Sequence, residues 1–281
     1  MQPTPTTRAE RQLARRRRAR RSIAISAGST AVVILGVALA ILLSPGWRTV
    51  REKFLSWHFF KMSLSSLPTG FWVDVRMFLI IEAIVLVLGL AIALIRTLPA
   101  PVLFPVRAVA VVFVDVMRGV PTLILLYIFG FGFLALGFSF IPGDETILGG
   151  AALACSYSAY VSEVFRAGIE SVNPSQPAAA LAVGLTRTQA LRYVVLPQAI
   201  RAVVPPLLND FIGLTKDVAL VSILGPQEIA RIAQINADYY FNYTPYVAAA
   251  VFYLVITLPL IRIVDHMRYR GLQRQNALVL M

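Results

Sequence analysis

The feature that most restricts the fold of this chain is a series of apolar runs, several of them close to 20 residues long. An α-helix of ~20 residues crosses a hydrocarbon layer about 30 Å thick, and inside that layer every backbone polar group needs an internal partner. Hydrophobic residues make up 58% of the 281 residues and charged residues only 14%, whereas a soluble domain has about 25% charged residues. The sequence therefore predicts an all-α integral membrane protein.

Hydropathy predicts about six transmembrane helices. The predicted spans are residues 22–44, 71–95, 105–136, 146–165, 200–224 and 243–264. The third is longer than one straight crossing requires, and we expect Pro121 to break or kink it because proline removes a backbone hydrogen bond. A basic run precedes the first span, but that span is too long for a signal peptide, so we expect it to remain as an anchor.

The segments outside the spans follow from their charge. They are a basic cytoplasmic tail (1–21), an external amphipathic segment (45–70), a cytoplasmic insert (168–199) and a C-terminal cytoplasmic tail (269–281). With the N-terminus in the cytoplasm, the inner segments hold 18 of the 26 Lys and Arg residues and the outer segments hold five. The positive-inside rule therefore places both termini and the insert in the cytoplasm. Because this clustering at membrane edges accounts for the net charge of +12, we expect membrane lipid around the chain and no nucleic-acid partner.

The insert contains the sequence QPAAALAVGLTRTQALRYVVLP at residues 176–197. We expect a helix that begins near Gln176 and ends at Gly184, because glycine is the usual residue just past a helix end. Thr186 and Gln189 have capping-box spacing, so a second helix is expected to begin at once and to end at Pro197. From the residues alone, a docking element for another protein and an ordinary loop with interfacial helices explain this stretch equally well.

Ionisable and strongly polar side chains inside apolar spans are costly, so each is a candidate functional group. Glu82 lies midway along the second span, where it either makes an interhelical hydrogen bond or faces the α-amino group of a substrate. Asn209 and Asp210 follow two prolines in the fifth span, where we expect a broken helix to expose them to a cavity. Lys216 and Asp217 are adjacent, and we expect them to pair with each other or with a neighbouring span.

The sequence lacks the residue patterns that several other classes of function require. The chain has no GxxxxGK[ST] phosphate loop, so any ATP and Mg²⁺ would be bound by a partner chain and no cofactor is expected here. His58 and His266 fall in different predicted compartments, so we expect no metal site, and no nucleophile has a plausible base beside it. Asp115 and Arg118 are three residues apart and are expected to form a structural pair on one helix face.

Five short motifs follow one another between about Phe71 and Arg268. They are DVMRGVP (115–121), YSAYVSEVFRAG (157–168), Gly184 with LPQ (196–198), PPLLNDF (205–211), and KD (216–217) followed by LVS (220–222). In order and spacing they resemble the permease subunit of polar-amino-acid ABC importers of the His/Glu/Gln type. One residue departs from the pattern, because the family's loop usually begins Glu-Ala-Ala and Ala178 stands here in place of the glutamate.

The resemblance implies a type-I importer fold, with a five-helix core and one additional N-terminal helix, in a bacterial cell membrane. It implies uptake of a polar amino acid, similar to glutamate or glutamine, driven by ATP hydrolysis in a separate ATPase. The other implied partners are a second permease subunit, either a copy or a paralogue, and an extracytoplasmic substrate-binding protein. The implied ATPase-coupling residues are Gln176, Ala178, Ala179, Ala180, Gly184, Leu185 and Pro197. The candidate substrate pathway consists of Glu82, Asn209, Asp210, Lys216 and Asp217.

Two functions of other classes stay open. In an ion-coupled secondary transporter, Glu82 and Asp210 would carry a proton or a sodium ion, and transport would collapse with the ion gradient. A structural or assembly protein of the membrane would move no substrate at all. Copurification of a P-loop ATPase distinguishes the importer from both.

Overall fold

The computed structural model describes residues 8–97, 102 and 104–279, and for 8–21 and 268–279 it describes the backbone alone. Within these ranges the chain forms helices and no strands. Of the two predicted cytoplasmic tails, residues 1–7 and 280–281 lie outside the described residues. The chain divides into two compact units, Met1–Ser56 and Trp57–Met281.

The first unit contains two helices. α1 (Arg8–Leu42) includes most of the first predicted span, and the large apolar side chains of that span are exposed. α2 (Trp47–Phe54) lies in the segment predicted to be amphipathic and buries none of its residues. Its Arg48 Nε lies 2.9 Å from Glu52 Oε1, one turn further along the helix. Trp47, Val50 and Phe54 recur at the spacing of one helix face, and charged residues lie between them, as in an interfacial helix.

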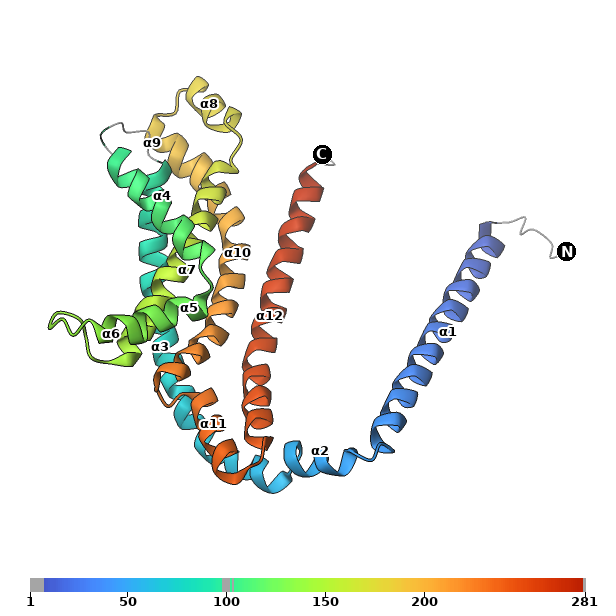
Figure 1. The fold of residues 1–281 in the computed structure, drawn as a ribbon. Coiled ribbons are helices and arrows are strands. Elements are labelled where there is room, and N and C mark those ends of the chain that lie inside the picture. Colours follow the sequence, from blue (N-terminus) through green and yellow to red (C-terminus); the bar gives the residue numbers. More distant parts are fainter. Residues whose placement is uncertain (1–7, 98–101, 103, 280–281) are drawn as a thin grey trace. The chain divides into compact units, whose positions relative to one another are not determined.

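The second unit is built around long helices that pack together in Figure 1. They are α3 (Trp57–Thr97), α7 (Glu145–Glu170), α10 (Leu196–Asp217) and α12 (Thr244–Val279). Apolar side chains of α3, α7 and α10 form the main core, with Val85, Leu153 and Leu214 fully buried. The predicted boundary between residues 70 and 71 lies inside α3, so part of the expected external segment continues the helix of the second span.

Small residues let these helices approach closely. A Cβ atom added at Gly89 of α3 would lie 2.7 Å from Val161 Cγ1 of α7. A Cβ at Gly168 of α7 would overlap the side chain of Val203 on α10. Close approach through small residues is the usual way in which helices pack when lipid removes the hydrophobic drive between them.

The third predicted span is broken at Pro121, as expected. α4 (Phe104–Gly119) and α5 (Thr122–Tyr127) meet at a bend of 106°. A π-helical turn, η2 (Ile128–Gly132), and the short α6 (Phe133–Ala135) follow. Gly130 in that turn lies directly against Leu224, which leaves no room for a side chain. The chain therefore turns back on the bundle instead of crossing straight.

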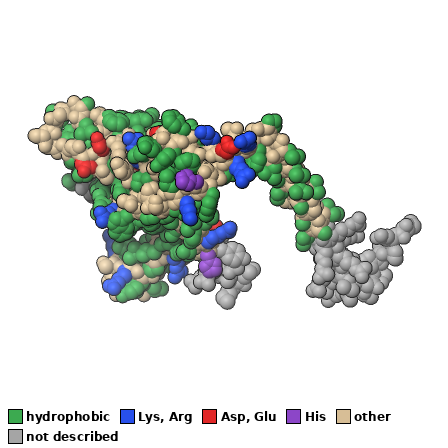
Figure 2. All heavy atoms as spheres, turned by 90° about the horizontal axis from the view of Figure 1, so that it is seen from below, with side chains coloured by type: hydrophobic (Ala, Val, Ile, Leu, Met, Phe, Trp, Pro, Cys, Tyr) green, Lys and Arg blue, Asp and Glu red, His purple; other side chains and the backbone are tan. Residues whose placement is uncertain are grey.

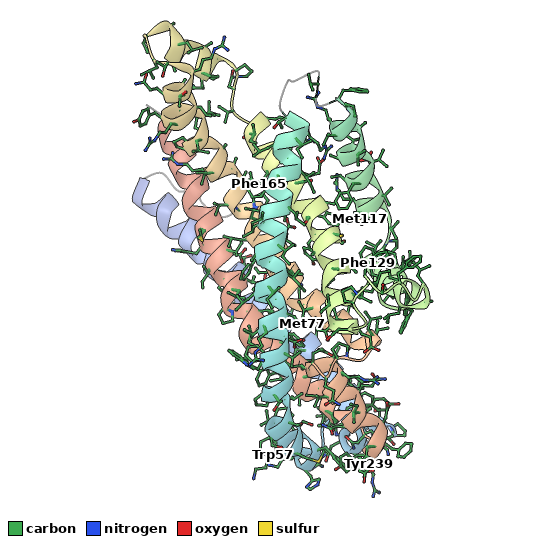
Figure 3. The ribbon with its side chains drawn as sticks, turned by 90° about the vertical axis from the view of Figure 1, so that its left-hand side faces the viewer. Trp57, Met77, Met117, Phe129, Phe165 and Tyr239 are labelled. Atoms are coloured by element: carbon green, nitrogen blue, oxygen red, sulfur yellow. The ribbon has the colours of Figure 1, made fainter. Side chains whose placement is uncertain are left out.

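Two further groups of elements lie at opposite ends of this bundle (Figure 1). α8 (Ser175–Ala182), α9 (Arg187–Ala190) and the π-helical turn η3 (Leu191–Val195) lie at one end. The 3₁₀ helix η4 (Val218–Leu224) leads to α11 (Ile229–Tyr240) at the other. Figure 3 shows Trp57 and Tyr239 together at the α11 end, with Phe165 nearer the opposite one.

Two expectations about prolines are wrong. Pro197 does not end the second helix of the insert, because it occupies the first turn of α10, where a backbone N–H has no intrahelical partner to lose. Pro205 and Pro206 do not break the fifth predicted span either, since both lie inside α10, which runs without interruption from Leu196 to Asp217.

The described residues contain three stretches long and apolar enough to cross a membrane, namely Ser22–Leu42, Trp47–Thr97 and Thr244–Met267. The bent pair α4 and α5–α6 adds a fourth if it is one span. α7 and α10 are not among them, so their crossing of the membrane stays a prediction. Figure 2 shows hydrophobic side chains over much of the visible surface, and Val87, Val109 and Val255 are 69%, 70% and 68% exposed. Such a surface is expected where lipid replaces water.

Candidate functional site

The insert between α7 and α10 has a sharply defined elbow at Gly184. Its backbone there has φ +91°, a left-handed conformation that glycine adopts without penalty. The N–H of Gly184 donates to the carbonyl of Leu181 at 3.0 Å, and the N–H of Leu185 donates to that of Ala180 at 3.1 Å. This pair of bonds is a Schellman motif, which satisfies the last carbonyls of α8. The predicted stop at Gly184 is thus confirmed.

The second helix of the insert starts two residues later with the predicted capping box. Thr186 Oγ1 accepts from the N–H of Gln189, whose side chain accepts in turn from the N–H of Thr186. Before α8, Asn173 Oδ1 accepts from the N–H of Ser175 at 3.0 Å. The elbow is therefore held by local hydrogen bonds on both sides of Gly184.

Most of the coupling residues implied by the resemblance are accessible. Ala180 is buried and Leu185 half-buried, while the others are exposed: Gln176, Ala178, Ala179, Gly184 and Pro197. Large apolar side chains are exposed beside them, with Val183 at 80% and Tyr193 at 64%. A segment with this much accessible apolar surface on a preformed elbow can bind another protein.

A polar cluster, called the interior cluster below, lies where α3, α7 and α10 meet, and its side chains are half-buried. Tyr157 of α7 donates its hydroxyl to Asp217 Oδ2 of α10 at 2.9 Å. Asp210 lies near enough to interact electrostatically with both Glu82 of α3 and Tyr157. Its Oδ2 atom is buried and has no hydrogen-bond partner. Gly213 makes room for the phenol, since a Cβ atom there would lie 3.1 Å from the Tyr157 hydroxyl.

This cluster contains three of the five candidate pathway residues and one residue that sequence reasoning missed. Glu82, Asp210 and Asp217 come together, whereas Asn209 and Lys216 are exposed. Asp217 accepts a hydrogen bond from Tyr157 of α7 and does not pair with Lys216. Of the two predicted pairings of Asp217, the one with a neighbouring span is therefore confirmed. The signal for Tyr157 was present, because it is a large polar side chain in the small-residue stretch ALACSYSAY. Three carboxyl groups and a phenol can accept hydrogen bonds from a cationic group.

A second polar group, an ion-pair network at the insert end of the bundle, was also missed. Glu163 of α7 forms ion pairs with Arg96 of α3 and with Arg166, whose Nη2 lies 2.6 Å from Glu163 Oε2. Arg118 of α4 reaches the same carboxylate at 3.9 Å. The predicted pair between Asp115 and Arg118 is therefore wrong, because Arg118 turns to α7, where its guanidinium also lies over the Tyr160 ring.

A third group joins α3, α11 and α12 at the other end. Tyr253 of α12 donates to Asp74 Oδ2 of α3 at 2.9 Å. Glu228 is fully buried and caps α11 by accepting from the N–H groups of Ala230 and Arg231 at 2.7 and 2.6 Å. Burial raises the pKa of Glu228 to about 7, aided by the charge of Asp74 and opposed by the two N–H groups. These two buried carboxyl groups hold the N-terminus of α11.

Among the residues whose side chains are described, no group of three or more His, Cys, Asp or Glu side chains could hold a metal ion. The candidate site consists of an exposed elbow at one end of the bundle and a half-buried polar cluster where α3, α7 and α10 meet.

Comparison with known proteins gives consistent matches over most of the second unit. The family of binding-protein-dependent transport system inner membrane components matches residues 86–270. The probable glutamine ABC transporter permease protein GlnM of Bacillus subtilis strain 168 is 34% identical over 175 residues, or 62% of this chain and 78% of that protein. The probable amino-acid permease protein YxeN of the same strain is 33% identical over 208 residues, or 73% of this chain and 90% of that protein.

A solved structure gives the same result. The crystal structure of an amino acid ABC transporter with histidines matches 74% of this chain and 97% of its own chain, with a TM-score of 0.65 and 32% sequence identity. The family match includes the whole insert and all residues of the polar cluster except Glu82, which lies before residue 86. The chain therefore belongs to the family of binding-protein-dependent transport system inner membrane components.

Proposed function

We propose that this chain is the membrane-spanning permease of an ATP-driven importer of a polar amino acid, similar to glutamate or glutamine. A separate ATPase binds the insert, and its cycle of ATP binding and hydrolysis drives the helices between outward and inward openings. The chain works with a second permease subunit and receives its substrate from an extracytoplasmic binding protein. Both termini face the cytoplasm of a bacterial cell.

The observation that carries this proposal is the exposed elbow of the insert, inside a chain that belongs to this family. The elbow lies at one end of the bundle and is rigid, because the Schellman motif and the capping box fix it on both sides of Gly184. A rigid element can transmit force between a partner and α7 and α10, to which the insert is directly joined. The glutamine and amino-acid permeases among its relatives support the choice of substrate.

The interior cluster supplies the substrate contact in this proposal. Glu82 and Asp210 are the counter-charges for the α-amino group, and Tyr157 positions Asp217 nearby through its hydrogen bond. The unpartnered Oδ2 atom of Asp210 supports this role, because a buried acceptor without a donor is costly unless a ligand supplies one. Lys216 and Asn209 line the pathway at its accessible edge in this scheme.

The test is purification of the tagged chain from the membrane of a bacterium that produces it. We expect a P-loop ATPase to copurify. In liposomes we expect the complex to import labelled glutamine or glutamate only when ATP is inside, on the side of the ATPase, and binding protein is outside. Uptake that needs no ATPase and stops when the ion gradient is dissipated would instead identify a secondary transporter. A chain that supports no uptake under either condition would be an assembly protein.

A further inference from the structure

The insert surface, defined as the exposed side chains Leu181, Val183, Arg187, Leu191, Arg192 and Tyr193, combines apolar area with positive charge. Leu181 and Leu191 are 44% and 56% exposed, beside the more exposed Val183 and Tyr193. Arg187 and Arg192 are exposed as well. Exposing so much apolar area to water is unfavourable, so this surface is suited to binding a partner.

The charge of this surface is of one sign. Between Ser171 and Asn209 the sequence contains no Asp or Glu and three arginines, the third being Arg201. The ion pairs formed among the described side chains of α7 use Glu163 and Glu170, and neither Arg187 nor Arg192 takes part in them. The Arg192 guanidinium instead lies 5.8 Å from the centroid of the Tyr193 ring. Both arginines are thus available to carboxylates of a partner.

We propose that the insert binds an ATPase whose docking groove has an apolar floor and acidic residues on its rim, an inference that rests on the proposed function. The apolar side chains fill the floor, and Arg187 and Arg192 meet the acidic rim. Charge complementarity of this kind sets partner choice and association rate. A bilayer surface fits the insert less well, because interfacial binding uses one continuous amphipathic face, whereas the chain here changes direction at Gly184 and α9 has only 4 residues.

The first test measures how firmly the purified complex holds its ATPase as the salt concentration rises. An acidic rim predicts that the ATPase dissociates progressively with added salt, since screening weakens charge pairs at the rim of an interface. Retention that does not change between low and high salt would overturn the proposal.

The second test uses charge changes in the insert with matched controls. We expect the double variant Arg187→Glu/Arg192→Glu to bind the ATPase about tenfold or more weakly, and Arg187→Gln/Arg192→Gln to lose less. Arg262→Glu reverses an exposed charge on α12, outside the insert, and is the control for charge reversal as such. Undiminished ATPase binding by the double Glu variant, with an unchanged thermal unfolding profile, would overturn the acidic rim while leaving the importer assignment intact.

The third test adds a negative charge to the insert. Ala178 is exposed on α8, and a glutamate near a helix N-terminus favours the helix, so any loss of binding by Ala178→Glu comes from the partner and not from an unfolded helix. We expect weaker binding than for Ala178→Gln, which adds similar size without charge. Stronger binding by Ala178→Glu would show a basic groove and overturn the proposal.

If the double Gln variant keeps the ATPase but loses binding to vesicles of anionic phospholipid, the surface is a membrane contact. If the unaltered chain brings down no ATPase at all, the proposed function itself fails.

Discussion

At the scale of single residues, Gly184 determines the shape of the insert by its backbone and not by its packing. A Cβ atom added there meets no atom within 4 Å, yet the backbone has φ +91°. The cost of a larger residue is therefore conformational, on the order of 1–3 kcal/mol for a non-glycine residue held in this region. A β-branched residue tolerates positive φ least.

We therefore expect Gly184→Val to distort the elbow and reduce ATPase copurification and transport, at normal expression and with the bundle intact. Gly143→Val is the matched control, because Gly143 also has open space around it but has no positive φ. Copurification and uptake measured side by side decide the matter. Undiminished transport by Gly184→Val would contradict the role of the elbow.

The carboxyl groups of the interior cluster give a second prediction at this scale. Glu82→Gln and Asp210→Asn nearly preserve shape and remove charge, so each should weaken apparent affinity for the imported amino acid by about 10- to 150-fold, as for the loss of ~1.5–3 kcal/mol. Asp115→Asn on α4 is the control, because Asp115 is exposed and has no part in the cluster.

The measurement is the concentration dependence of ATP-driven uptake, with complex assembly and ATP hydrolysis checked in parallel. If both variants assemble, hydrolyse ATP and import with unchanged apparent affinity, the two carboxyl groups are structural. A change in one alone assigns the substrate contact to that residue.

At the scale of elements, α11 is fixed to the bundle by its N-terminus. Gly70 of α3 lies so close that a Cβ atom would be 2.7 Å from the backbone nitrogen of Ile229. Glu228 caps α11 from within, and Tyr253 ties Asp74 of α3 to α12. Glu228 is fully buried, so its ionised form loses the solvation it has in water. The two short hydrogen bonds from backbone N–H groups offset part of that loss.

The raised pKa of Glu228 makes the stability of this element depend on pH. Its pKa rises from 4.5 to about 7 on folding, so the folded state holds the proton more tightly than the unfolded state. The stabilising contribution is complete below pH 4.5 and is lost as pH rises through about 7, which amounts to a few kcal/mol. Glu228→Gln abolishes this titration while it keeps an oxygen that accepts hydrogen bonds.

We therefore expect the unfolding temperature of the wild-type protein in detergent to fall relative to that of Glu228→Gln as pH rises from about 5 to about 8. Thermal unfolding at several pH values measures this difference. Asp238→Asn removes an exposed carboxyl from the same helix and is the control. Parallel pH profiles for the wild type and Glu228→Gln would contradict the assignment.

At the scale of the whole molecule, function depends on which side of the membrane the insert faces. The insert and α11 lie at opposite ends of the second unit (Figure 1), so one orientation determines the other. The distribution of Lys and Arg predicts that the insert is cytoplasmic, where an ATPase can reach it.

Cysteine labelling tests this topology. In a Cys155→Ala background, which removes the single native cysteine, Thr188→Cys should react with an impermeant maleimide only after the cytoplasmic face is opened. Asp238→Cys on α11 is exposed and should react in intact cells. Labelling of Thr188→Cys in intact cells would reverse the orientation and remove the insert from the reach of an ATPase.

The sequence by itself determined those features that depend on one continuous stretch of chain. The helical class follows from apolar length, the bend from Pro121, and the elbow from Gly184 with the Thr186–Gln189 box. Each depends on residues that are close together along the chain, so each can be found without knowing what surrounds it.

Only the tertiary structure decided the pairings between helices. Tyr157 reaches Asp217 and Arg118 turns to Glu163, across 60 residues in the first case. These contacts depend on how each helix is rotated and how deeply it is placed against its neighbours, which hydropathy does not encode. The same holds for Pro205 and Pro206, which lie inside the continuous helix α10, whereas Pro197 occupies its first turn. A local rule predicts breaks there, but it does not include the packing of α10 against α3, α7 and α12, which stabilises the helix as a whole.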